Sequence, residues 1–357
     1  MTSSEIEKLV SDDAKGMYTF YAKNMAPLQP NESRLARFFK FAWYLFLAFL
    51  LKLTPARRLL YAIAMVLVGL AFWDDDIMKA LYGIIILNFL LAMELADKLV
   101  TRDELEFARQ IQLSLLPDTI VPIKGFSLST YSEVAESVGG DYYDLLPGAR
   151  GSTLVVIGDV SGKGISAALY MVKVQTALQL LSQKHSDPKE LMLQLNDYLY
   201  GKFRRNFFLT ITITQVFPNG KIRYCRAGHM PLLHLDAKNK NCAWLQPKGT
   251  AIGLAPPEQN QNGNGVHKIF EKSLEIEETT LKTGDVIVLY TDGVVESINR
   301  IEEEFGQSRL MQVVRDYSEG DADSLKEQLV ERLKRFRSGE ELRDDTTFVV
   351  LKKNGTA

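Results

Sequence analysis

The sequence predicts an α+β fold, in which antiparallel sheets are covered by helices and a helical, hydrophobic region precedes them. After about residue 120, strand-like segments come in clusters, and helical patterns fall in pairs between them. Pro218-Asn219-Gly220 separates two strand-like segments, which is a strong hairpin signal. This order is typical of antiparallel sheets with helices outside and differs from a regular βαβ repeat.

Composition excludes several classes of protein. The chain has 357 residues and a formal net charge of -2, which argues against nucleic-acid binding driven by bulk charge. Cys225 and Cys242 are its two cysteines, so the sequence predicts no disulfide framework, no CxxC zinc site and a reducing compartment. The start is polar and acidic without an apolar run, and we expect no cleavable signal peptide.

Residues 1–37 are predicted to form a polar N-terminal segment, and residues 38–97 a hydrophobic helical region. That region holds three apolar segments, which cover residues 38–53, 59–73 and 77–95. A bilayer span needs about 20 apolar residues, with about 17 as the lower limit, so each segment is short or borderline.

The charges around these segments favour a membrane hairpin. Arg57 and Arg58 precede the second segment, Asp74-Asp75-Asp76 follows it, and Lys98 and Arg102 follow the third. By the positive-inside rule, the acidic turn lies outside, and both ends and the α+β domain that follows lie on the cytoplasmic side of the inner membrane. The first segment then lies in the interface or forms a third buried helix. The alternative is a soluble, cytoplasmic helical bundle.

A charged helix is predicted over residues 98–117, continuing from the third apolar segment and ending at Leu116-Pro117. One interpretation is a simple connector. The other is a signalling helix that forms a homodimer through residues 98–116. The remaining residues, 118–357, are predicted to form the α+β domain.

Within that domain the patterns predict individual elements. Strands are expected near residues 126–134, 153–157, 207–217, 221–226, 286–290 and 347–351. Helices are expected near residues 164–183, 188–202, 306–317 and 320–337, and a loop at 255–265.

Four predicted strand ends each carry an aspartate, namely Asp141, Asp159, Asp292 and Asp344. Glycines adjoin the first three and allow a ligand to approach the main chain closely. Oxygen ligands suit hard divalent cations, and clustered carboxylates are costly unless cations neutralise them. We therefore expect these side chains to converge on two metal ions that activate a water for attack on a phosphoryl group.

Rival interpretations fit less well. Gly158 to Gly164 lacks the GxxxxGK[ST] spacing of a phosphate-binding loop, so Lys163 is not a catalytic candidate of that kind. Gly139-Gly140-Asp141 resembles a diguanylate cyclase loop only superficially, because Tyr142-Tyr143 follows it. His229 lies on a Gly-His-x-Pro turn and is interpreted as structural.

Taken together, the motifs resemble the PPM-type metal-dependent serine/threonine phosphatases, in their bacterial SpoIIE/RsbU-like branch. The resemblance covers residues 105–353 and rests on segments 108–117, 139–144, 158–164, 227–231, 283–293 and 344–347.

The resemblance implies a β-sandwich with helices on both outer faces and two Mn²⁺ or Mg²⁺ ions between the sheets. It implies that Asp159 bridges the ions and that the Val160 carbonyl is a backbone ligand. Asp141, Asp292 and Asp344 complete the implied catalytic set, and Asp345 is added to them only among the implied metal ligands. Asp144 is expected around the site and not among its ligands.

The activity implied is hydrolysis of phosphoserine or phosphothreonine by a metal-activated water, without a phosphoenzyme. No residue substitutes obviously for the phosphate-binding arginine of the eukaryotic-type relatives. The implied substrate is a regulatory phosphoprotein, an anti-sigma factor antagonist of the STAS type. The alternative is a catalytically silent phosphatase-fold module that binds a partner, and the presence of all four aspartates favours the enzyme.

Overall fold

The chain divides into two compact units, residues 1–103 and 104–357. The computed structural model describes residues 40, 43, 44, 46, 47, 50, 51, 53–115, 117, 123–204, 206–254 and 269–355. The predicted polar segment 1–37, half of the first apolar segment and the predicted loop at 255–265 lie outside the described residues.

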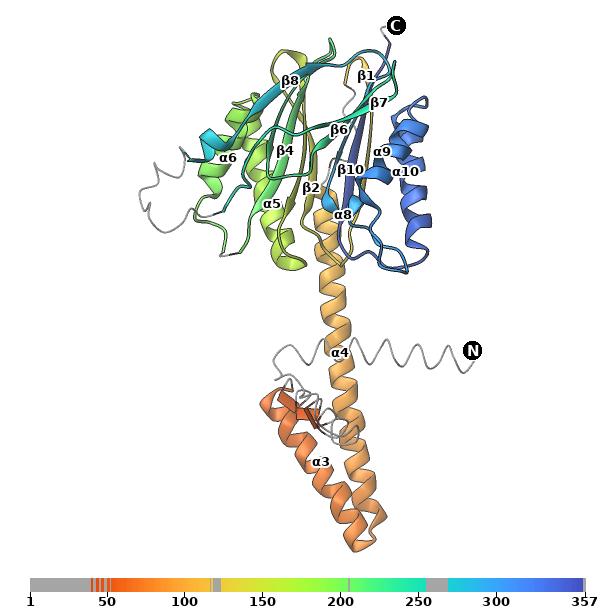
Figure 1. The fold of residues 1–357 in the computed structure, drawn as a ribbon. Helices are drawn as coiled ribbons and strands as arrows, with labels where there is room; N and C mark the ends of the chain where they lie inside the picture. Colours follow the sequence, from red (N-terminus) through yellow and green to blue (C-terminus); the bar gives the residue numbers. More distant parts are fainter. Residues whose placement is uncertain are drawn as a thin grey trace. The chain divides into compact units, whose positions relative to one another are not determined.

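Two helices, α3 (Pro55–Asp74) and α4 (Ile77–Leu115), follow each other closely along the chain (Figure 1). Proline at the first position of α3 suits a helix start, and Asp75 ends the helix in the left-handed region, at φ 52°. Both helices are long and apolar enough to cross a membrane by length and composition. The third apolar segment and the predicted linker helix are a single helix, which ends before Pro117.

The helices α3 and α4 pack closely at Gly83. A Cβ on this glycine would lie 2.6 Å from Val68 Cγ2 and 2.9 Å from the Ala64 carbonyl oxygen, so a larger residue would separate the two backbones. At the other end of the pair, Arg57 forms ion pairs with Glu94 at 3.0 Å and with Asp97 at 2.7 Å. The two helices therefore form an antiparallel hairpin.

The second unit is a β-sandwich with helices on both outer faces, as predicted (Figure 1). One sheet has the strand order β1-β10-β9-β6-β7 and the other the order β2-β3-β4-β5-β8, and the paired strands are antiparallel. The strands are β1 (Phe126–Glu133), β2 (Asp141–Pro147), β3 (Thr153–Val160), β4 (Leu209–Val216), β5 (Lys221–Ala227), β6 (Leu232–Asp236), β7 (Asn241–Leu245), β8 (Ile276–Thr280), β9 (Val286–Tyr290) and β10 (Thr346–Lys353). The helices are α5 (Ile165–Ser182), α6 (Pro188–Leu199), α8 (Asp292–Val295), α9 (Gly306–Asp316) and α10 (Ala322–Arg337).

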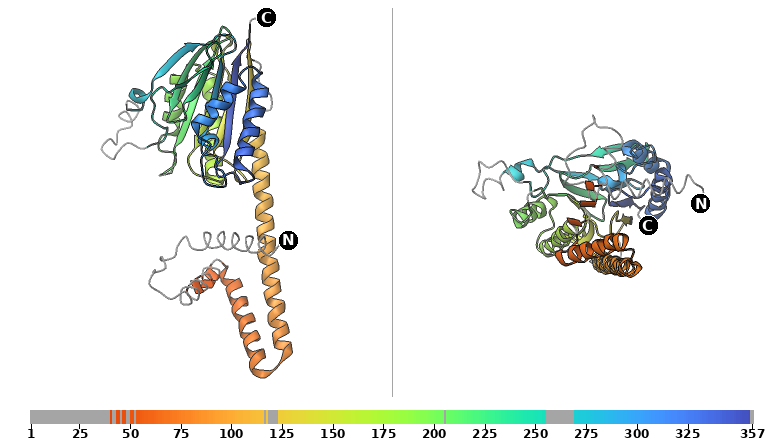
Figure 2. Two further views of the ribbon diagram at one scale, coloured as in Figure 1. Left: turned by 45° about the vertical axis from the view of Figure 1, so that its right-hand side comes forward. Right: turned by 90° about the horizontal axis from the view of Figure 1, so that it is seen from below.

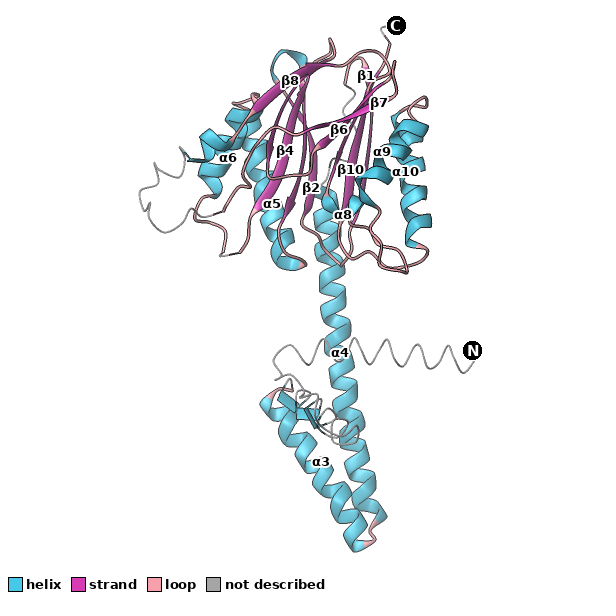
Figure 3. Ribbon diagram, in the orientation of Figure 1, coloured by secondary structure: helices cyan, strands magenta, loops and turns pink. Residues whose placement is uncertain are grey.

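Successive side chains along the central strands point to opposite faces of the sheet, so the apolar residues are divided among three cores. In β3, Leu154 and Val156 face α5 and α6, whereas Val155 and Ile157 face the opposite sheet. In β10, alternate residues likewise contact α9 and α10 on one side and the opposite sheet on the other. The helices lie outside the strands in Figure 3, and Figure 2 shows α9 and α10 beside the sheet that contains β10.

The predicted hairpin at residues 218–220 joins β4 and β5, and Gly220 adopts φ 93° there. The predicted strands correspond to β1, β3, β4, β5, β9 and β10, and the predicted helices to α5, α6, α9 and α10. The sequence patterns missed β2, β6, β7 and β8. Asp141 and Asp144 interrupt the apolar character of β2, and β7 and β8 are short edge strands with mostly polar or exposed residues.

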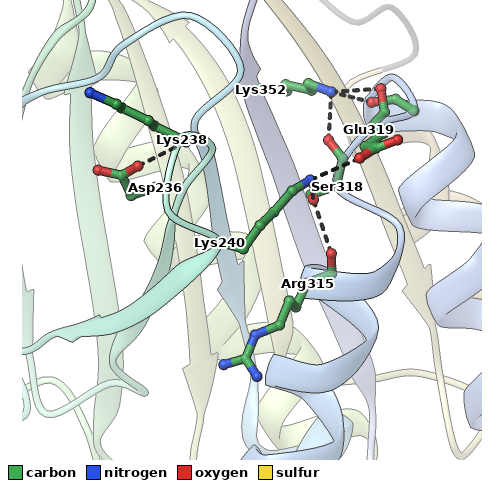
Figure 4. A network of polar contacts seen from close by, with 8 residues as sticks. Asp236, Lys238, Lys240, Arg315, Ser318, Glu319 and Lys352 are labelled. Carbon is green, nitrogen blue, oxygen red and sulfur yellow. Dashed lines mark hydrogen bonds and ion pairs between the residues drawn. The ribbon is translucent and has the colours of Figure 1, made fainter.

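Lys352 attaches the loop between α9 and α10 to the sheet (Figure 4). Its ammonium donates to the carbonyl oxygens of Ser318 at 2.7 Å and Glu319 at 3.1 Å, and to that of Gly320. Lys240, from the β6–β7 turn, donates to Ser318 Oγ at 2.9 Å. Carbonyl groups at a helix C-terminus lack partners within the helix, and Lys352 supplies donors for this segment.

We expect Lys352→Met to lower the free energy of unfolding by about 1–2 kcal/mol, because three carbonyl groups lose a charged donor. Lys238→Met is the matched control, since the Lys238 ammonium makes no hydrogen bond or ion pair with any described residue, and it should change stability by less than about 0.5 kcal/mol. Pulse proteolysis of the full-length protein in mild detergent across a urea series measures both values. Equal stabilities would show that the loop does not depend on Lys352.

Candidate metal centre

Strand ends from both sheets bring the predicted aspartates to one end of the sandwich. Asp141 and Asp159 are direct partners in the β2–β3 register. In the other sheet, Asp292 follows β9 and Asp344 precedes β10, and these strands pair side by side. The amide of Thr291 donates to the Thr347 carbonyl oxygen at 2.9 Å, which extends the pairing to the aspartates.

Glycines at this end of the sandwich allow backbone atoms of neighbouring segments to lie very close together. A Cβ on Gly140 would lie 2.6 Å from the Val160 carbonyl oxygen and 3.1 Å from Asp159 Oδ1. A Cβ on Gly293 would lie 2.0 Å from the Asp345 carbonyl oxygen. Both distances to the carbonyl oxygens are below any normal contact, so these motif positions require glycine for steric reasons.

Asp345 joins the two sheets through backbone amides. Its Oδ1 accepts from the Ala135 amide at 2.9 Å, and its Oδ2 accepts from the Gly140 amide at 2.8 Å. A carboxylate oxygen has two lone pairs, so each oxygen keeps one for a further partner. Asp345 therefore has a structural role here, and its predicted role as a metal ligand stays a prediction.

Thr291 orients Asp141. Its hydroxyl donates to Asp141 Oδ2 at 2.8 Å, and the Thr347 amide donates to the same hydroxyl oxygen at 3.1 Å. All three residues are buried, so the carboxylate has little freedom to rotate. The sequence patterns assigned Thr291 no role, although it belongs to the Tyr-Thr-Asp-Gly motif.

The carboxylates repel one another. Burial, together with the charges of Asp159 and Asp345, raises the pKa of Asp141 well above its usual range. The pKa of Asp159 is raised to about 7, first by burial and then by the negative charges of Asp292, Asp344 and Asp345. The nearby cation is Lys163, whose Nζ lies 2.9 Å from Asp344 Oδ2.

The chemistry of this donor set fits divalent cations of the Mg²⁺ or Mn²⁺ type. The donors are carboxylate oxygens and the Val160 carbonyl, the ligand atoms that hard cations prefer. Within the part of the chain that the structure describes, no three His, Cys, Asp or Glu side chains already form a finished ligand set. Bound cations would remove the repulsion that raises the carboxylate pKa values and would draw the side chains together.

Two other residues considered at the sequence level make contacts apart from the aspartate side chains. Asp144 accepts hydrogen bonds from the Tyr142 hydroxyl at 2.9 Å and from Gln179 of α5 at 3.3 Å, on the face of β2 that the helix covers. His229 is buried, its Nδ1 lies 2.9 Å from Thr210 Oγ1, and burial followed by the charge of Arg226 lowers its pKa to about 3. The imidazole is therefore neutral, and its Nε2 is buried without a hydrogen-bond partner among the described residues.

Gln112, on α4, holds the backbone next to the aspartates. Its side-chain nitrogen donates to the Gly139 carbonyl oxygen at 2.7 Å, and its side-chain oxygen accepts from the Gly139 amide at 3.1 Å. Gln112 is buried, and Gly139 lies two residues before Asp141. Gln175 of α5 also donates to the carbonyl oxygen of Leu115, near the end of α4. The end of α4 is thus hydrogen-bonded to the segment that carries Asp141.

Gln112→Met keeps the size of this side chain but leaves the amide and carbonyl of Gly139 without partners. The cost is about 1–3 kcal/mol, so we expect hydrogen exchange in residues 138–141 to accelerate about tenfold or more. Mass spectrometry of the full-length protein measures the exchange. The control is Gln110→Met, at an exposed position on the same helix, which should leave the exchange unchanged. The same exchange rate in both variants would contradict the role of Gln112.

The chain is similar in sequence to a family model and to known bacterial proteins. The family model of stage II sporulation protein E (SpoIIE) matches residues 149–354. Protein IcfG of Synechocystis is 28% identical over an alignment of 257 residues, and the match covers 63% of this chain and 37% of IcfG. Phosphoserine phosphatase RsbU of Bacillus subtilis is 26% identical over 254 residues, which are 71% of this chain and 70% of RsbU.

A solved structure shares the fold. The SiaA-PP2C domain of Pseudomonas aeruginosa superimposes with a TM-score of 0.60 at 20% sequence identity. The match covers 72% of this chain and 98% of the domain, so it includes the sandwich and both helical layers.

Proposed function

Because this chain belongs to the SpoIIE family of PPM-type serine/threonine phosphatases, we propose that it hydrolyses phosphoserine or phosphothreonine on a regulatory protein. The observation that carries this proposal is the group of aspartates around Asp159, which come from strand ends of both sheets. Oxygen donors that repel one another are a site for divalent cations, and such cations suit phosphoryl transfer.

The residues proposed to hold two Mn²⁺ or Mg²⁺ ions are Asp141, Asp159, the Val160 carbonyl, Asp292, Asp344 and Asp345. When bound, the ions would supply Lewis acidity and lower the pKa of a water that attacks phosphorus. The role of the chain is to fix the ligands before the substrate arrives. Thr291 orients Asp141, and the amides of Ala135 and Gly140 hold Asp345.

Asp159→Asn tests this assignment in two ways. We expect phosphatase activity toward p-nitrophenyl phosphate with Mn²⁺ to fall at least about a hundredfold, because the central ligand loses its charge. In the absence of metal, the variant should be more stable than the wild type, since one of the repelling carboxylates is gone. Steady-state kinetics and thermal unfolding in detergent measure the two effects.

The control for Asp159→Asn is Asp316→Asn, at an exposed position of α9, which should change neither quantity. Activity of Asp159→Asn equal to that of the wild type would contradict the metal assignment. An inactive wild-type protein with Mn²⁺ and with Mg²⁺ would favour the alternative of a silent module that binds a partner.

We propose an anti-sigma factor antagonist of the STAS type as the regulatory phosphoprotein. The motif resemblance to the SpoIIE/RsbU-like branch supports this substrate class, and RsbU of Bacillus subtilis is itself a phosphoserine phosphatase. Comparing the phosphoproteins of a wild-type strain and of a strain without this protein would identify the substrate.

We further propose that residues 38–97 anchor the protein in the inner membrane, with the catalytic unit in the cytoplasm. Phe72, Trp73 and Ile77, at the turn between α3 and α4, are 79–86% exposed, which a soluble hairpin would avoid. Arg57 lies near the start of α3, and Lys98 lies beyond the apolar part of α4, as the positive-inside rule requires for a cytoplasmic end.

We expect the full-length protein to sediment with membranes, to stay there in high salt and at alkaline pH, and to dissolve only with detergent. Fractionation followed by immunoblotting measures this. Full-length protein in the soluble fraction without detergent would exclude the membrane hairpin and leave the helical bundle.

The exposed apolar residues of α4 support dimer formation through residues 98–116. These residues are Leu99, Val100, Phe107, Ile111 and Leu113. Apolar side chains along a charged helix suit pairing with a second copy of the helix. Cysteine crosslinking at Leu99 or Leu105 measures dimer formation, and monomer alone would exclude this pairing.

A further inference from the structure

A cavity of about 250 Å³ borders the proposed metal centre. Gly293 and Asp344 form its wall toward the aspartates, and the loop segments 296–298 and 341–343 form much of the remainder. Its cationic side chains are Lys163, Arg337 and Arg343. A phosphorylated side chain that reaches the metal centre from this cavity therefore passes these cations.

Two of the three cations already have partners away from the aspartates. Arg337 pairs with Glu133 at 3.2 Å, and its side chain is only 11% exposed. Arg343 pairs with Glu302 at 3.4 Å. Neither guanidinium forms an ion pair with a proposed metal ligand among the described residues, although Arg343 and Glu302 are both largely exposed, at 64% and 78%.

Lys163 is directed at the metal centre. Its Nζ lies 2.9 Å from Asp344 Oδ2 and also donates to the carbonyl oxygen of Arg343, and half of the side chain is exposed. An ammonium group has three donors, and among the described residues these two acceptors account for two of them. One N–H thus remains for an incoming anion.

The charges of the neighbours restrict where an anion can bind. Glu296, Glu304 and Glu341 line the rest of the cavity, so a phosphate dianion is repelled from its middle. Lys163 lies at the end next to Asp344, where cations bound by the aspartates would add positive charge. A cation held by Asp344 would weaken the attraction of this carboxylate for the ammonium and leave Lys163 available to the phosphate.

We propose that Lys163 is the phosphate-binding residue of this enzyme and that the cavity beside it receives the phosphorylated serine or threonine segment. This inference rests on the phosphatase activity proposed above. Lysine binds phosphate as a compact charge with charge-assisted hydrogen bonds, and it takes the place left by the missing arginine. The acidic remainder of the cavity favours substrate segments with neutral or basic residues next to the phosphate.

The test compares full-length wild-type protein with Lys163→Met and Lys163→Arg in detergent. With saturating Mn²⁺, we expect Lys163→Met to raise the KM for p-nitrophenyl phosphate and the inhibition constant of inorganic phosphate about tenfold, the loss expected for one charge-assisted hydrogen bond. Lys163→Arg should restore most of both values. Calorimetric titration with inorganic phosphate measures the same loss without turnover.

The Mn²⁺ concentration for half-maximal activity separates phosphate binding from support of Asp344. We expect Lys163→Met not to raise it, because the ammonium competes with cations for Asp344. The matched control is Lys184→Met, at an exposed position beyond the end of α5, which should change none of these values.

Unchanged phosphate inhibition in an active Lys163→Met variant would overturn the role of Lys163 and leave the phosphatase assignment intact. A rise in the Mn²⁺ requirement that accounts for the whole loss would also overturn it, because Lys163 would then act through Asp344. An inactive wild-type protein would overturn the proposed function, and this inference with it.

Discussion

Repulsion among carboxylates at one end of the sandwich is the constraint on which the rest of this molecule depends. Asp159 lies among Asp292, Asp344 and Asp345, in a buried environment that opposes negative charge. Asp141 and Asp345 are fixed by donors from the opposite sheet and from a distant loop, so these two carboxylates cannot relax by moving away from the others. The apolar cores of the sandwich supply the stability that holds the charges together.

This arrangement explains why small residues and hydroxyl groups surround the aspartates. Gly140 and Gly293 leave room for carbonyl oxygens that a Cβ would displace. Thr291 gives Asp141 a donor without adding a charge. Lys163 is the cation next to the group, and it lies at the rim, where its ammonium can exchange partners.

Much of the fold could be predicted from the sequence, because strands such as β3 and β10 are buried on both faces and their apolar runs are plain. The strand β2 was missed because its aspartates resemble turn residues, although they occupy buried strand positions. Asp141, Asp159 and Asp292 could be placed at strand ends from their glycine neighbours, and Asp344 from the apolar strand that follows it. The roles of Thr291 and Gln112 could not, because their partners lie 150 and 27 residues away along the chain.

The aspartates of the proposed metal centre are divided between the two sheets, so the centre forms only when the sheets pack together. Asp141 and Asp159 belong to one sheet, and Asp292, Asp344 and Asp345 belong to the other. Neither half of the sandwich contains a centre of its own. A cation that binds all of these residues binds only the docked pair of sheets, so its binding energy adds to the cohesion between them. Such a cation would hold the two sheets together as well as support the reaction.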